Sequence, residues 1–213
     1  MAHARSAVER WLRWSGLVPL PAFLLLHLAR ELALSAPDDV SQVVRQPPST
    51  FGLLSSALLV WLPLALHCAL ALWQLSSSQR ALPRPTDVAK TARVASRVCA
   101  VFALLFLVYH ARQYPLAVLL READASDAGF RLLAELSGTS FGMPLRAGAY
   151  LFGLAATVAH AGLALHRALL AEGWLDQGPR RAISARWCAT GAVLLFLAGA
   201  AAVIRVASGV LLR

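Results

Sequence analysis

Five long apolar stretches limit what this chain can fold into. They cover about residues 15–34, 51–75, 98–119, 147–170 and 187–212. A helix needs about 20 mostly apolar residues to cross the hydrocarbon core of a bilayer, and each stretch provides them. Prolines and glycines interrupt the connections between the stretches, where helix-breaking residues belong. We therefore expect an all-α integral membrane protein in which residues 1–213 form one domain of five transmembrane helices.

The composition also favours a membrane protein. Of the 213 residues, 58% are hydrophobic and only 15% are charged, which is unusual for a soluble domain. Most of the 20 Lys and Arg lie between the apolar stretches and form no basic face, so we expect no nucleic-acid binding. Cys68, Cys99 and Cys188 lack the spacing of a zinc site, a thiol redox pair or covalently attached haem, and are interpreted as core residues.

The first apolar stretch has a second interpretation. Basic residues precede it, and Ala33, Ser35 and Ala36 resemble the cleavage site of a secretory signal. Pro37 would be a poor residue after such a cut, and the stretch carries a histidine that finds a partner elsewhere in the chain. We therefore interpret it as the first transmembrane helix.

The basic residues predict how the helices are oriented. The amino-terminal segment and the second and fourth connections carry twelve basic and four acidic residues, whereas the other connections and the carboxy terminus carry seven of each. Cytoplasmic loops are enriched in Lys and Arg. We expect a multi-pass protein of the cytoplasmic membrane with its amino terminus in the cytoplasm and its carboxy terminus outside. In the third connection, a short interfacial helix is expected around Phe130, Leu132, Leu133 and Leu136.

Histidines within the apolar stretches are the candidate functional residues. Five of the six histidines lie there, namely His27, His67, His110, His160 and His166. Polar side chains inside a bilayer are costly and usually functional, although a hydrogen bond to a neighbouring helix would explain any one of them.

Their depth sorts four of these histidines into two pairs. His27 lies three residues and His110 two residues before an arginine at the outer end of its stretch. His67 lies 22 residues and His160 14 residues after the nearest preceding arginine, which at about 1.5 Å per residue places them roughly 15 to 30 Å deeper. We expect His27 to pair with His110 in the outer part of the membrane, and His67 with His160 in the inner part.

Paired histidines at two depths predict two bound haems. Neutral imidazole is an axial ligand of haem iron, and helical bundles form such sites from facing side chains. Two histidines per iron leave no position for oxygen or substrate, so the expected chemistry is electron transfer through a four-helix haem-binding bundle with one supporting helix. Zinc is the rival metal, but it prefers four ligands that converge on one point.

Short motifs around these histidines resemble a known family. They are Ser15-Gly16-x-x-Pro19 and His27-Leu28 in the first stretch, Pro63 four residues before His67, Arg97-Val98 before His110, and Tyr150-x-x-Gly153 before His160, with Gly173-Trp174 and Arg180-Arg181 beyond. In this order, with no histidine in the fifth stretch, they are similar to the five-helix, two-haem cytochrome b subunit of succinate dehydrogenases and fumarate reductases. The resemblance covers nearly the whole chain.

The resemblance implies cofactors and partners. It implies two haem b groups, the inner one held by His67 and His160 beside a peripheral iron–sulfur subunit, and the outer one by His27 and His110. A flavoprotein subunit would interconvert succinate and fumarate, so this chain would have no succinate-oxidising site of its own. Electrons would pass between the iron–sulfur subunit and a membrane quinone, which is usually menaquinone in the five-helix type.

Four polar residues near the haem ligands are further candidates. Arg30 and Arg112 are candidates for contacts with the outer haem propionates, the alternative being that they only reach the lipid headgroups. Glu31 is the candidate for proton exchange with quinone, the alternative being a solvated headgroup residue. His166 is interpreted as a packing residue, with a propionate or quinone contact as its alternative.

Three residues depart from the family pattern. Leu12 and Arg13 stand where the family commonly has a His-Ser pair, which leaves an inner haem contact without its usual residues. Val158 stands where some fumarate reductases have a glutamate, so we expect no transmembrane proton route through that position.

Two other functions stay open. The chain could be the di-haem anchor of another quinone-linked oxidoreductase, such as a nitrate reductase or formate dehydrogenase, in which the histidines are distributed differently over the helices. It could also be a haem-free transporter or scaffold whose histidines gate protons or pack, which requires four coincidences of depth.

Overall fold

In the part of the chain that it describes, the computed structural model consists of helices joined by short turns. It describes residues 10–11, 14–33, 54, 57–77, 87–113, 116, 128–174 and 178–208. The elements are α2 (Pro19–Ala33), the π-helix η1 (Ala57–Trp61), α5 (Leu62–Ser77), α6 (Asp87–Gln113), α8 (Ala128–Ser137), α9 (Leu145–Ala171) and α10 (Pro179–Ala207). Within these ranges the only extended pairing is an isolated bridge between Ser140 and Met143.

Three of these helices are long and apolar enough to cross a membrane. They are Val94–Gln113 within α6, Leu145–Ala171 and Pro179–Ala207, and two shorter apolar helices cover Trp14–Leu25 and Leu58–Trp73. The expectation of an all-helical chain is confirmed for the described residues, and their three candidate spans and two shorter apolar helices suggest a multi-pass membrane protein.

Prolines divide the two shorter apolar helices. Proline lacks an N–H group and its ring clashes with the carbonyl four residues earlier. The helical residues 14–17 end in a turn at Val18, immediately before Pro19 begins α2. The π-helical turn of η1 stops at Trp61, two residues before Pro63, as expected where the regular hydrogen-bond ladder cannot continue.

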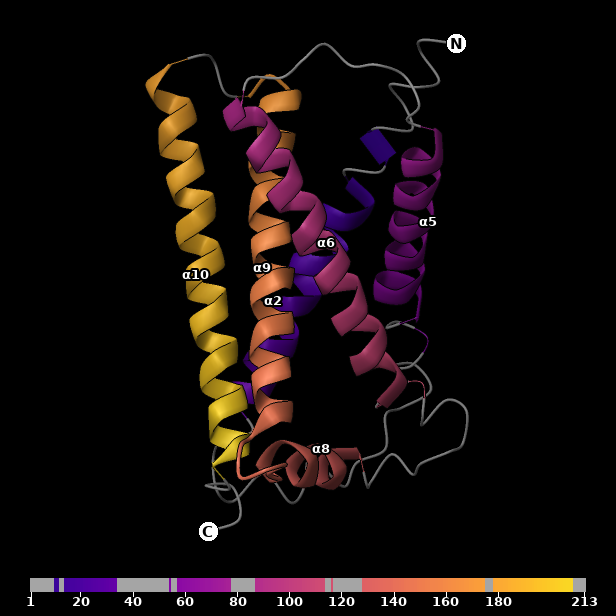
Figure 1. Ribbon diagram of the computed structural model, residues 1–213. Helices are drawn as coiled ribbons and strands as arrows, with labels where there is room; N and C mark the ends of the chain where they lie inside the picture. Colours follow the sequence, from indigo (N-terminus) through magenta and orange to yellow (C-terminus); the bar gives the residue numbers. More distant parts are fainter. Residues whose placement is uncertain are drawn as a thin grey trace.

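The long helices pack around α9. In Figure 1, α6 and α10 flank α9, and both make extensive contacts with it. Small residues allow this close approach: a Cβ atom on Gly162 of α9 would lie only 3.2 Å from the Cβ atom of Ala192 on α10. Such small-residue contacts are typical of helices packed within membranes. Leu24 of α2 and Leu154 of α9 belong to a buried cluster that joins these helices to α10.

The two ends of the bundle are closed differently. Helix α8 lies across one end (Figure 1), as expected for a short helix in this connection, and its Leu136 is buried against Ala147 and Tyr150 of α9. At the opposite end the rings of Trp14 and Trp174 pack with their centres 6.3 Å apart. We call these the α8 end and the Trp174 end.

Candidate functional site

Two histidines face each other near the α8 end. His27 of α2 and His110 of α6 have ring centres 6.1 Å apart and ring planes inclined by 68°. A phenylalanine one turn earlier on the same helix stacks on each ring: Phe23 on His27 with centres 5.3 Å apart, and Phe106 on His110 with centres 5.9 Å apart. These aromatic neighbours help to fix the position of both imidazoles. We call His27 and His110 the α8-end pair.

A second histidine pair lies nearer the Trp174 end. His67 of α5 and His160 of α9 have ring centres 6.4 Å apart and ring planes inclined by 63°. The His67 ring lies directly against the backbone of Gly16, where an added Cβ atom would be 2.6 Å from its Nδ1 atom. The His160 ring lies beside the Ser96 backbone, and its Nδ1 atom is buried without a hydrogen-bond partner among the described residues. We call these two residues the Trp174-end pair.

The structure brings together the same two pairs that depth in the membrane predicts. Their separation can be followed along α9, because Tyr150 contacts His110 whereas His160 belongs to the other pair. These two positions are ten residues apart, which corresponds to about 15 Å along a helix. The two pairs therefore lie at two levels of one bundle.

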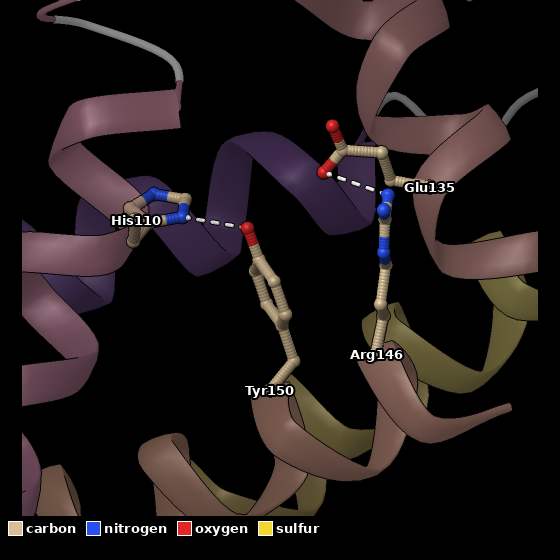
Figure 2. A network of polar contacts seen from close by, with 4 residues as sticks. All are labelled: His110, Glu135, Arg146 and Tyr150. Atoms are coloured by element: carbon tan, nitrogen blue, oxygen red, sulfur yellow. Dashed lines mark hydrogen bonds and ion pairs between the residues drawn. The ribbon is translucent and has the colours of Figure 1, made fainter. Parts of the chain in front are cut away.

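A hydroxyl group from a third helical segment contacts one histidine of each pair. The Nδ1 atom of His110 lies 3.3 Å from the hydroxyl of Tyr150 (Figure 2), and the Nδ1 atom of His67 lies 3.5 Å from Oγ of Ser15. Both hydroxyl residues are buried, Tyr150 with 5% and Ser15 with 9% of its surface exposed. Sequence reasoning did not give either residue a role at the site, although both belong to the motifs quoted above.

The spacing within each pair fits two axial ligands of one metal ion. An imidazole nitrogen lies about 2 Å from a bound metal and about 1 Å from the centre of its own ring, so two rings on opposite sides of the metal have centres about 6 Å apart. The observed 6.1 and 6.4 Å agree with this value. Within the described residues, no three His, Cys, Asp or Glu side chains gather around one point. Two histidines at this spacing can serve as two ligands of one metal ion.

Arg30, Glu31, Arg112 and His166 are the other candidate residues. Arg112 is an exposed residue in the last turn of α6, at the α8 end. Arg30 and Glu31 belong to the last turn of α2, and their side chains lie outside the described part of the structure. The Nδ1 atom of His166 lies 3.3 Å from Oγ of Ser184, so this histidine links α9 to α10.

Comparison with known proteins finds no match to this chain. No protein-family model, no curated protein and no solved structure matches the chain. The family resemblance therefore depends on the sequence motifs alone, whereas the two histidine pairs are an observation of the structure.

Proposed function

We propose that this chain is the membrane-anchor, di-haem cytochrome b subunit of a succinate:quinone oxidoreductase. It would carry electrons between a peripheral iron–sulfur subunit and a membrane quinone. The observation that carries the proposal is the placement of four histidines from four apolar segments in two facing pairs, with ring centres 6.1 and 6.4 Å apart. All five apolar segments would cross the membrane, and α10, which has no histidine, would support the other four.

The histidine pairs would each hold one haem b. His27 and His110 would hold the outer haem, and His67 and His160 the inner haem. When bound, haem b would supply one-electron redox chemistry, and the two histidines of each pair would hold its iron. The stacked Phe23 and the surrounding apolar helices would keep water from the site.

The two ends of the bundle would then have different partners. The excess of basic residues assigns the Trp174 end to the cytoplasm, where the iron–sulfur subunit and its flavoprotein would bind. The α8 end would face outward, where Arg30 and Arg112 would neutralise haem propionates and Glu31 would exchange protons with menaquinone. These residues belong to the last turns of α2 and α6, two to four residues after His27 or His110 in the sequence.

Haem counts in single variants test the ligand assignment. We expect His67→Ala and His160→Ala to lose the same haem, because they share one site, and His27→Ala and His110→Ala to lose the other. The measurement is haem content together with the reduced-minus-oxidised absorption spectrum of the purified complex. The matched control is His166→Ala, which removes a histidine bonded to Ser184 and should retain both haems. Two full haems in all four ligand variants would refute the assignment.

Co-purification tests the identity of the complex. A tagged chain extracted from native membranes should bring flavin and iron–sulfur clusters with it, and succinate should reduce its b-type haem. Recovery of a nitrate reductase or formate dehydrogenase instead would leave the haem sites in place but overturn the proposed partner. A chain free of haem in its native membrane would favour the transporter or scaffold alternative.

A further inference from the structure

We infer that Ser15 and Tyr150 are positioning residues that set the reduction potentials of the two haem sites separately. Each hydroxyl would hold one histidine of a pair through its Nδ1 atom, Tyr150 in the α8-end pair and Ser15 in the Trp174-end pair. The inference rests on the proposed function, since it concerns the haem that each pair would bind.

Tyr150 is fixed where it can act on only one histidine pair. Its ring packs edge-on against Phe106 with centres 5.4 Å apart, and against His110 with centres 5.7 Å apart. It also belongs to the buried cluster formed with Leu136 of α8 and Ala147 of α9. Figure 2 shows the hydroxyl directed at the His110 ring. A rotation of Tyr150 away from this contact would therefore disturb its packing against α6 and α8.

Ser15 is fixed in a corresponding way beside the other pair. It is buried in the helical residues 14–17, which end before Pro19. Its neighbour Gly16 lets the His67 ring lie against the backbone, so the ring nitrogen is within reach of a side chain as short as serine. Trp14, on the other side, is held by its contact with Trp174.

The chemistry follows from how an imidazole binds a metal. A neutral imidazole that coordinates through Nε2 carries its proton on Nδ1, and a hydrogen bond from that N–H group fixes the tautomer and orientation of the ring and makes it a more basic ligand. Here the hydroxyl oxygen of Ser15 or Tyr150 would accept this hydrogen bond. A more basic ligand favours the oxidised iron, so removal of the hydroxyl should raise the reduction potential of that haem.

Two segments of the chain each supply a hydroxyl to one histidine pair and a histidine to the other pair. The first apolar segment carries Ser15 for one pair and His27 for the other, and α9 carries Tyr150 and His160 in the same alternation. The spacings of twelve and ten residues correspond to about 18 and 15 Å along a helix. Each segment therefore contributes to both sites, but no hydroxyl serves both, so the two potentials can be changed one at a time.

Redox titration of the intact complex tests the inference. Tyr150→Phe should raise the potential of the haem that His110→Ala removes, and Ser15→Ala that of the haem that His67→Ala removes. We expect up to a tenfold change in the ratio of oxidised to reduced haem, or about 59 mV for one electron, while the second haem keeps its potential. Ser15→Thr retains a hydroxyl, so the haem held by His67 and His160 should keep the potential that it has in the unsubstituted protein.

Two matched substitutions serve as controls. Tyr109→Phe removes a hydroxyl from a tyrosine that packs on Tyr150 with ring centres 6.1 Å apart. Ser184→Ala removes the hydroxyl that is hydrogen-bonded to His166. Both should leave the two potentials unchanged.

The outcomes separate the inference from the proposed function. Two haems with unchanged potentials in Tyr150→Phe and Ser15→Ala would overturn the inference and leave the proposed function intact, as would equal shifts of both haems in either variant. Absence of haem from the unsubstituted complex would overturn the proposed function itself. If Tyr150→Phe fails to assemble, the Ser15 variants test the same claim at the other pair.

Discussion

At the scale of single residues, the size of the side chains next to the histidines is as important as their chemistry. Gly16 leaves room for the His67 ring, and Gly153 leaves room for Phe106, whose Cβ atom would be 2.6 Å from a Cβ atom at that position. In both cases an aromatic ring lies closer to the backbone of a helix than it could if the glycine were replaced by a larger residue. These two glycines therefore determine where the His67 and Phe106 rings lie, and Phe106 in turn stacks on His110.

Gly16→Ala should damage one haem site selectively. The added methyl group would displace the His67 ring, and overpacking of this kind typically costs about 1–3 kcal/mol. We expect reduced occupancy of the haem held by His67 and His160, measured as haem per chain. Gly191→Ala is the matched control, because a Cβ atom there meets nothing within 4 Å. Equal haem occupancy in the two variants would contradict the role given to Gly16.

The residues at the site differ in how well the sequence predicts them. The four paired histidines were found because they are polar residues in apolar stretches at matching depths. Ser15 and Tyr150 act on partners 52 and 40 residues away, and neither hydropathy nor spacing indicates which ring nitrogen a hydroxyl will meet. Such contacts depend on the rotation of each helix about its axis, which one sequence does not determine.

At the scale of helices, the apolar stretches predicted which segments are helical better than where the helices end. Helix α6 begins at Asp87 and α10 at Pro179, although the apolar stretches begin near 98 and 187. The added turns are rich in alanine and arginine, which favour helix but are not apolar as a group. Hydropathy measures the part of a helix that suits lipid, so it misses the polar turns that continue the helix beyond it.

The position of α8 should depend on apolar packing more than on its ion pair. Leu136 is buried with 2% of its surface exposed, and Leu→Ala substitutions at such positions cost about 2–5 kcal/mol. The carboxylate of Glu135 lies 3.6 Å from the guanidinium of Arg146, which is half exposed (Figure 2), and such pairs contribute about 0–1 kcal/mol. We therefore expect Leu136→Ala to lower the melting temperature of the purified protein clearly, and Glu135→Gln to change it little. The reverse order would show that the ion pair holds α8.

At the scale of the whole molecule, the described helices form a bundle with two distinct ends. The turn between α8 and α9 and the last turn of α10 lie at the α8 end, whereas the end of α9 and the start of α10 lie at the Trp174 end (Figure 1). The large apolar side chains exposed on α10, including Val193, Leu194 and Leu197, suit contact with lipid between these ends.

Cysteine labelling can determine which end faces the cytoplasm. In a variant with Cys68, Cys99 and Cys188 replaced by alanine, Thr139→Cys at the α8 end should react with a membrane-impermeant maleimide in intact cells. Glu172→Cys at the Trp174 end should react only after the cells are permeabilised, because the distribution of basic residues predicts that this end is cytoplasmic. The opposite pattern would reverse the orientation and move the proposed partner subunits to the α8 end.

The central claim is that the two histidine pairs bind two haems, and haem stoichiometry tests it most directly. The protein, purified with its native complex, should contain two haem b groups per chain by pyridine haemochrome assay, and reduction should give a b-type absorption difference spectrum. Properly assembled protein without a b-type signal would contradict the claim, because the pairs at 6.1 and 6.4 Å would then be packing contacts between helices.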